Sequence, residues 1–226
     1  MKAGSEGDSQ HDDEKETGRV EAFSDGVIAI AITLLILEIR VPKVAEIASV
    51  GLGAKLLSLW PSFLAFATSF GTILVMWVNH HRIFRLVRTT DYPFLYWNGF
   101  LLFTITFLPF PTALVAEHLA GPEPTMAMAV YAGTMVVIAL AFNGLWRYLR
   151  THPHLLLASA DPAEIACISQ QYRHGPLFYM IAFGLAFVSV TASIAACLAL
   201  AIFFAFAGRP TGRASRDDRT PARLHD

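Results

Sequence analysis

The stretch from Arg19 to Pro42 reads R-V-E-A-F-S-D-G-V-I-A-I-A-I-T-L-L-I-L-E-I-R-V-P. Residues 26–37 form an uninterrupted run without charge, which Glu38 and Arg40 close. A helix of about 20 residues extends about 30 Å, which is the thickness of the hydrocarbon core of a bilayer. The stretch therefore predicts a membrane-spanning helix whose first turns carry ionisable residues, and such residues are costly near a membrane.

The composition of the whole chain supports a membrane protein. Of its 226 residues, 54% are hydrophobic and 15% are charged, whereas a soluble domain carries about 25% charged residues. The acid-rich residues 1–17 and the Arg-rich residues 209–226 predict disordered cytoplasmic tails on either side of a membrane domain, residues 18–208. We therefore expect an all-α integral membrane protein.

Four further apolar segments follow the first helix, and the last of them is long enough to cross twice. Residues 175–207 contain no ionisable group, and one straight helix of that length would extend about 50 Å, so we predict two short helices that turn near residues 189–193. Six crossings leave all but three of the 17 Lys and Arg residues on the cytoplasmic side. The sequence thus predicts six transmembrane helices, both termini in the cytoplasm, and a non-spanning connection at residues 151–173. Pro109 and Pro111 predict a break in the third helix. The apolar segments are residues 54–78, 92–118, 125–150 and 175–207.

Four residues of the first helix share one face on a helical wheel: Ile30, Thr33, Leu34 and Leu37. Around a symmetry axis they would form stacked apolar rings, which limit passage by dewetting and by the cost of removing water from an ion. The same spacing also fits a surface that faces lipid or the protein core. No second F-S-D pattern occurs in the sequence, so a pore made from several copies of this helix requires several subunits.

The polar residues at the start of the first helix need partners from elsewhere. Arg19 and Asp25 are about 120° apart around the helix, so they cannot pair with each other. The run W-V-N-H-H from Trp77 to His81 lies at the same membrane depth and carries N–H groups that can donate to a carboxylate. Two hypotheses remain open: a polar clamp between the first two helices, and a pH-sensing role for the two histidines.

The sequence contains no pattern typical of an enzyme. It has no Gly-rich phosphate loop, no G-x-S-x-G and no H-E-x-x-H, and it also lacks a T-V-G-Y-G filter sequence. Glu38 could belong to a ring of carboxylates that enriches cations at the outer mouth of a pore, or it could lie at a solvated helix end. His152, His154 and His174 lack a spacing that would fix a metal ion.

Three motifs, in the same order, resemble those of a known family. The run R-V-E-A-F-S-D-G-V-I-A-I-A-I-T-L-L-I-L-E-I at residues 19–39 resembles the first-helix signature of the prokaryotic relatives of transmembrane protein 175, the endosomal and lysosomal potassium channel. The runs W-V-N-H-H-R-I-F at residues 77–84 and F-L-P-F-P-T-A-L-V-A-E at residues 107–117 resemble two further motifs of the family. The resemblance implies a homotetramer of six-helix subunits, whose first helices line a central potassium-permeable pore without a carbonyl filter.

The resemblance also implies roles for single residues. It places an apolar constriction at Ile30, Leu34 and Leu37, and a threonine linked to selectivity at Thr33, with K⁺ passing near these side chains. Behind the pore it implies a structural hydrogen-bond network, whose members are Arg19, Phe23, Ser24, Asp25, Trp77 and one or both of His80 and His81.

We therefore expect a passive, weakly selective potassium channel that crosses a bacterial inner membrane several times. Its expected partners are further copies of the chain and the lipid bilayer, and neither a cofactor nor nucleic acid is expected. A proton-leak or proton-coupled cation transporter, with Asp25 and the two histidines relaying protons, is one alternative. A membrane anchor that conducts no ions is another.

Overall fold

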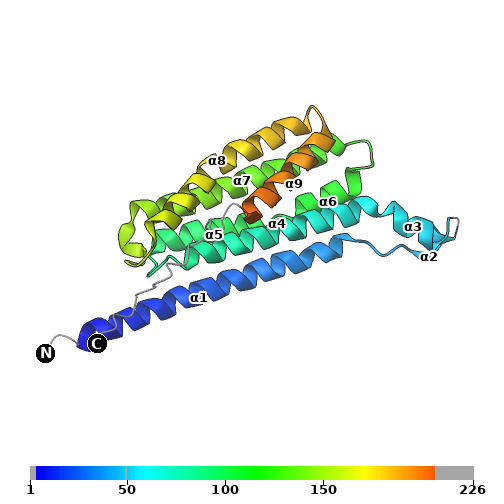
Figure 1. Cartoon of the computed structure of the whole chain (residues 1–226). Coiled ribbons are helices and arrows are strands. Elements are labelled where there is room, and N and C mark those ends of the chain that lie inside the picture. The colour runs from blue at the N-terminus through cyan, green and yellow to red at the C-terminus, as the bar shows by residue number, and fades with distance from the viewer. Residues whose placement is uncertain (1–3, 49, 207–226) are drawn as a thin grey trace, which may run out of the picture.

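The computed structural model describes residues 4–48 and 50–206, and every regular element of this part of the chain is a helix. Figure 1 shows the long helices lying side by side, with α1 along one edge of the bundle. This confirms the all-α prediction for the described residues. The helices are α1 (Gly4–Leu34), η1 (Leu35–Glu38), α2 (Val44–Ile47), α3 (Leu52–Ser58), α4 (Trp60–Phe84), α5 (Tyr92–Thr106), α6 (Pro109–His118), α7 (Pro124–Thr151), η2 (Pro153–Leu155), α8 (Pro162–Ala186) and α9 (Val190–Phe206).

Helix α1 packs against α4 and α5 through one face. Ser24, Ile28, Ala31 and Leu35 are buried on that face and recur every three or four residues, as neighbours on one side of a helix do. Side chains on the opposite face remain exposed in the single chain. One side of α1 thus holds it to its own subunit, and the other side is available to lipid or to a second copy.

Helix α1 begins earlier than the sequence predicts. It is continuous from Gly4, so residues 4–17 are helical where a disordered tail was expected. This segment contains no proline, and its Glu and Lys residues favour helix, so the helix continues beyond the apolar run. The second predicted tail, residues 209–226, lies outside the described residues.

Two loops at one end of the bundle are hydrogen bonded to each other and to α1. The amide of Leu157 donates to the carbonyl oxygen of Leu86 at 2.9 Å, and the amide of Arg88 donates to that of Leu155 at 2.7 Å. The hydroxyl of Thr17, which is buried in α1, donates to the carbonyl oxygen of Arg88 at 3.2 Å. The part of α1 around Thr17 is therefore tied to the loops that follow α4 and α7.

Two prolines separate α5 from α6. Asp91 caps α5, because its Oδ1 accepts a hydrogen bond from the amide of Phe94 at 2.9 Å. The helix ends at Thr106 and α6 begins at Pro109, since proline lacks an amide hydrogen and its ring clashes with the preceding turn. The predicted break is confirmed, and the two helices still form one apolar segment of 27 residues.

Helix α8 starts inside the connection that was predicted at residues 151–173. Asp161 caps it by accepting a hydrogen bond from the amide of Ala163 at 2.9 Å, and Pro162 occupies the first helical position. Residues 162–173 are therefore helical, and their place outside the membrane stays a prediction. The pair Asp161-Pro162 was the signal in the sequence for the start of this helix.

The apolar block at residues 175–207 contains the turn that was predicted, but a few residues earlier. Helix α8 ends at Ala186 and α9 begins at Val190. Ser193, which was expected in the turn, lies inside α9 and donates a hydrogen bond to the carbonyl oxygen of Ala182 at 2.7 Å. This buried bond holds α9 against α8.

Four helical segments of the described chain are long and apolar enough to cross a membrane. Helix α9 is apolar but has only 17 residues. The architecture is that of a membrane protein, and the crossing of the bilayer by α8 and α9 remains a prediction. The four segments are Lys15–Glu38, Trp60–Phe84, Tyr92–His118 and Pro124–Thr151.

Candidate functional site

The stripe predicted on the first helix is uncovered in the single chain. The exposed fractions are 60% for Ile30, 41% for Leu34 and 70% for Leu37, and Phe23, two turns before Ile30, is 67% exposed. A contiguous apolar surface of this kind marks contact with lipid or with another protein surface. The four side chains lie opposite the buried face of α1, so they point away from their own subunit.

Leu34 and Leu37 stand nearly above one another along this stripe. Leu37 lies in the 3₁₀ helix η1, which begins directly after Leu34. In a 3₁₀ helix, residues three apart eclipse each other instead of rotating around the axis. The change from α to 3₁₀ geometry thus keeps both leucines on the same side.

Thr33 presents an oxygen atom beside this apolar surface. Its side chain is exposed, and its hydroxyl donates a hydrogen bond to the carbonyl oxygen of Ile30 at 2.9 Å. Because the hydroxyl hydrogen is used within the helix, the lone pairs of Oγ1 remain available to accept. A threonine held in this way can offer oxygen to a cation.

A buried chain of hydrogen bonds joins α4, α5 and α1. His80 Nε2 lies 2.9 Å from Asn98 Oδ1, Asn98 Nδ2 donates to Ser24 Oγ at 2.9 Å, and Ser24 Oγ donates to the carbonyl oxygen of Val20 at 2.8 Å. His80 and Ser24 are fully buried and Asn98 is nearly so. Because Asn98 Oδ1 can only accept, His80 donates through Nε2, and its Nδ1 has no hydrogen-bond partner among the described residues.

A second set of contacts links α1 to α4 nearer the surface. Trp77 Nε1 donates to Asp25 Oδ1 at 2.9 Å, and His81 Nδ1 lies 2.8 Å from Glu21 Oε1. The rings of Trp77 and His81 stack with their centroids 6.1 Å apart. The two adjacent histidines thus have different environments, one buried against α5 and one exposed beside a carboxylate.

The structure does not bring Arg19 and Phe23 into these contacts. Both side chains are exposed, and neither makes a hydrogen bond or an ion pair within the described part of the chain. On the helical wheel they lie within about 30° of Ile30, on the stripe and away from Ser24. Within the single chain they make no contact with the network, and the role that the resemblance implies for them stays a prediction.

Asn98 and Glu21 were not predicted as members of these contacts. Asn98 is the central residue of the buried chain, and the available signal was an amide in the otherwise apolar segment of α5. Glu21 lies four residues before Asp25, on the same side of α1, so both carboxylates reach α4. A polar residue in an apolar spanning segment requires a partner, and that requirement would have identified Asn98.

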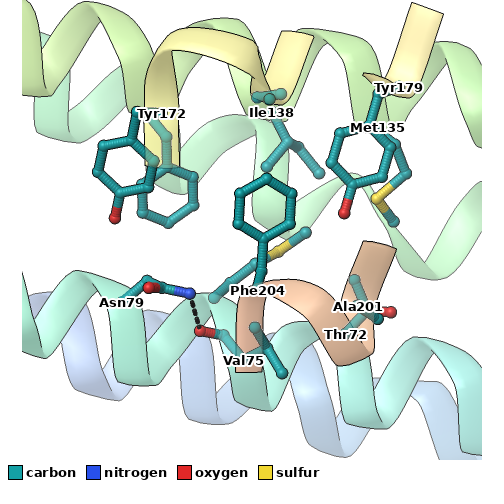
Figure 2. Close-up of a pocket in the computed structure, with 13 residues that line it drawn as sticks. Thr72, Val75, Asn79, Met135, Ile138, Tyr172, Tyr179, Ala201 and Phe204 are labelled. Atoms are coloured by element: carbon teal, nitrogen blue, oxygen red, sulfur yellow. Dashed lines mark hydrogen bonds between the residues drawn. The ribbon is translucent and has the colours of Figure 1, made fainter. Parts of the chain in front are cut away.

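A small internal cavity lies between α4, α7, α8 and α9, with a volume of about 50 Å³. Figure 2 shows Phe204 of α9 at its centre and Tyr172 and Tyr179 projecting from α8 toward α4. Asn79 borders it, and its Nδ2 donates to the carbonyl oxygen of Val75 at 2.9 Å. Helix α4 separates this cavity from α1, so it is not continuous with the exposed stripe.

Charged residues at the far end of α1 surround a larger cavity of about 620 Å³. Glu38 and Arg40 both line it. Arg40 lies 3.6 Å from Glu117, and Lys55 lies 3.1 Å from a carboxylate oxygen of Glu46. Acidic and basic side chains alternate around this end, so it carries no concentrated negative charge.

The histidines that were considered as metal ligands do not form a metal site. His152 and His154 lie close, with ring centroids 5.8 Å apart. Among the described residues, however, no group of three or more His, Cys, Asp or Glu side chains could hold a metal ion.

We expect the pair of Trp77 and Asp25 to contribute to stability more than to permeation. Changing Asp25 to Leu removes the acceptor of the indole N–H and should lower the free energy of unfolding by about 1 kcal/mol, because the contact is partly exposed. Asp25→Asn retains a carbonyl acceptor and should lose less. Thermal unfolding of the purified protein measures the difference, and Trp60→Phe, an exposed change elsewhere on α4, is the control.

A normal unfolding temperature for Asp25→Leu, together with altered ion selectivity, would contradict this assignment. Asp25 would then act on the permeating ion directly.

Comparison with known proteins finds one matching family and several relatives. A family model described as "Endosomal/lysosomal potassium channel TMEM175" matches residues 19–109. A potassium channel of Chamaesiphon minutus is 58% identical over 193 residues, which are 85% of this chain and 95% of the relative. A potassium channel of Streptomyces collinus is 43% identical over 192 residues, which are 84% of this chain and 92% of the relative.

A solved structure and a longer human protein are also similar. The crystal structure of a lysosomal potassium-selective channel TMEM175 homolog from Chamaesiphon minutus matches with a TM-score of 0.79 and 55% identity, covering 87% of this chain and 100% of that chain. The human endosomal/lysosomal proton channel TMEM175 is 34% identical over 141 residues, which are 59% of this chain and 28% of the human protein.

Proposed function

Because this chain belongs to the family of the endosomal/lysosomal potassium channel TMEM175 and is a potassium channel, we propose that K⁺ passes through a central pore lined by α1 and η1 of each subunit. The observation that carries the proposal is the uncovered stripe of Ile30, Leu34 and Leu37 on a helix whose other face is buried. Four copies of the chain would bury this stripe around one axis. Residues 18–208 would form the channel domain.

The proposed pore contains stacked apolar rings. Ile30, Leu34 and Leu37 follow each other at intervals of three or four residues, so their rings would lie about 5 Å apart. An ion in such a constriction loses part of its water shell, and the barrier for passage depends on the width and wetting of the rings. The Oγ1 atoms of Thr33, which lie between the first two rings, would replace part of the lost water.

The buried chain of hydrogen bonds supports this pore from behind. His80, Asn98 and Ser24 fix the packed face of α1, and the orientation of that face sets the direction of the stripe on the other side. The contacts of Asp25 and Glu21 with α4 add to this support. We infer that these residues position the pore helix and do not contact the ion.

The membrane topology we propose has six crossings per subunit and both termini in the cytoplasm of a bacterium. Four candidate spans and the apolar helix α9 support it, as does the distribution of Lys and Arg. In this orientation the end of η1 at Glu38 faces outward, and the joined loops at Arg88 and Leu155 lie inside.

A potassium flux assay on the purified protein in liposomes tests the proposed function. We expect a K⁺ gradient to drive a flux that a Na⁺ gradient of equal size drives less, with no need for a proton gradient. Liposomes without protein are the control. Equal flux of K⁺ and Na⁺ would contradict the preference for K⁺, and flux only when a pH gradient is present would contradict passive permeation.

Proton permeation is a second candidate, favoured by the contact of His81 with Glu21. His81 Nδ1 and Glu21 Oε1 lie 2.8 Å apart, and both side chains are partly exposed where α1 packs against α4. Reversal potentials measured in a pH gradient at symmetric K⁺ separate the two functions. A shift toward the proton equilibrium potential in the wild type that His81→Gln removes would support a proton path at this pair.

A further inference from the structure

Three arginines surround one groove at the inner ends of α7 and α8. The groove has a volume of about 1020 Å³, and Arg147, Arg150 and Arg173 line it together with His174. No Asp or Glu is among the described residues that line it.

The three guanidinium groups are unpaired within the described part of the chain. All three side chains are exposed, and none makes an ion pair or donates a hydrogen bond to a described residue. The two acidic residues at the start of α8 do not line the groove, and Glu164 instead accepts from Arg82 at 3.2 Å while Asp161 caps α8. The groove therefore carries an uncompensated positive charge.

Hydrogen bonds fix the walls of this groove. Trp146 Nε1 on α7 donates to Ser169 Oγ on α8 at 3.0 Å, and Asn143 Nδ2 donates to the carbonyl oxygen of Tyr172 at 2.6 Å. The two helices are thus held at a fixed distance where the arginines emerge. Arginine side chains around a rigid groove suit a phosphate group, which can accept several guanidinium hydrogen bonds at once.

Apolar side chains continue from the groove along both helices. On α7, exposed Leu140 lies two turns from Arg147 and on the same face. On α8, exposed Leu177 lies one turn after Arg173, and Ile181 follows one turn later. A free phosphate would contact only the basic end, whereas a phospholipid would place its headgroup there and its acyl chains along the apolar faces.

We propose that this groove binds the phosphodiester headgroup of an anionic phospholipid in the cytoplasmic leaflet. The assignment to the cytoplasmic leaflet rests on the membrane orientation in the proposed function, whereas the binding of the lipid rests on the groove itself. Basic grooves between transmembrane helices at the cytoplasmic surface are suited to such headgroups. The site is separate from α1, on the opposite part of the subunit in Figure 1.

Native mass spectrometry of the full chain in detergent tests this proposal. The probes are phosphatidylglycerol and phosphatidylcholine with identical acyl chains, added in equal amounts. We expect the wild type to retain phosphatidylglycerol preferentially. Arg147→Gln and Arg173→Gln should each weaken this binding about fivefold, and the double variant about 25-fold. Arg85→Gln is the control, because Arg85 is exposed at the same end of the bundle but outside the groove.

Three outcomes would overturn the proposal. Equal retention of both lipids by the wild type would exclude a headgroup site. An equal loss in Arg85→Gln and Arg173→Gln would mean attraction to general surface charge. Displacement of phosphatidylglycerol by inorganic phosphate at a similar concentration would mean a site for a soluble anion. The conservative variant Arg173→Lys should retain most of the binding, which separates loss of charge from misfolding. Because lipid retention is measured without ion flux, failure here leaves the potassium assay unaffected.

Discussion

Replacing Leu37 by asparagine is expected to raise the K⁺ conductance of the reconstituted channel about tenfold, which requires the barrier to fall by about 1.4 kcal/mol. Leu37 is the most exposed residue of the proposed constriction. An amide in each subunit would let water remain in the narrowest part of the pore, so the ion would lose less of its water shell. For the same reason the preference for K⁺ over Na⁺ should decrease. Single-channel recording in planar bilayers measures both quantities.

Ile36→Asn is the matched control for this experiment. Ile36 is adjacent to Leu37, belongs to the same 3₁₀ helix and is also exposed, but it points to a different side. We expect little change in conductance for this variant. Equal effects of the two substitutions, or no effect of Leu37→Asn and Ile30→Asn, would place the constriction elsewhere.

The second large effect is expected for Asn98→Leu, which should lower the free energy of unfolding by about 3 kcal/mol. The substitution leaves the buried Nε2–H of His80 without an acceptor, and each buried unsatisfied polar group costs about 1–3 kcal/mol. It also removes the donor to Ser24, which joins α5 to α1. The unfolding temperature should fall by about 10 °C.

Thr106→Ala is the control for Asn98→Leu, because it lies in the same helix, is exposed and bonds only to its own backbone. A double-mutant cycle with Ser24→Ala then separates the coupling of α5 and α1 from the loss at His80. If Asn98→Leu unfolds at the wild-type temperature, the buried chain of hydrogen bonds does not hold the first helix in place.

The apolar span of the first helix and its end could be predicted well because two independent signals agree there. The uncharged run after Asp25 gives a spanning length, and the charges at Glu38 and Arg40 mark its end, so η1 stops where the sequence indicates. The partner of Asp25 was also within reach of sequence reasoning. Trp77 donates to it because both lie at the same depth of adjacent helices.

The contacts that the sequence did not predict depend on packing between helices distant in sequence. Asn98 meets His80 and Ser24 only where α4 and α5 both pack against α1, and no periodicity specifies that geometry. The two histidines illustrate the same limit. They are adjacent in sequence, yet the 100° between neighbouring residues buries one and exposes the other.

The bond between Thr17 and the inner loops has a mechanical consequence for α1. Thr17 and Ser24 lie two turns apart on the same face, and each is fixed to a different part of the subunit, the first to the loop at Arg88 and the second to α5. A helix that is held at two points on the same face resists rotation about its own axis. In the proposed pore, we therefore expect a change in radius to move α1, α4 and α5 together, by tilting whole subunits against each other.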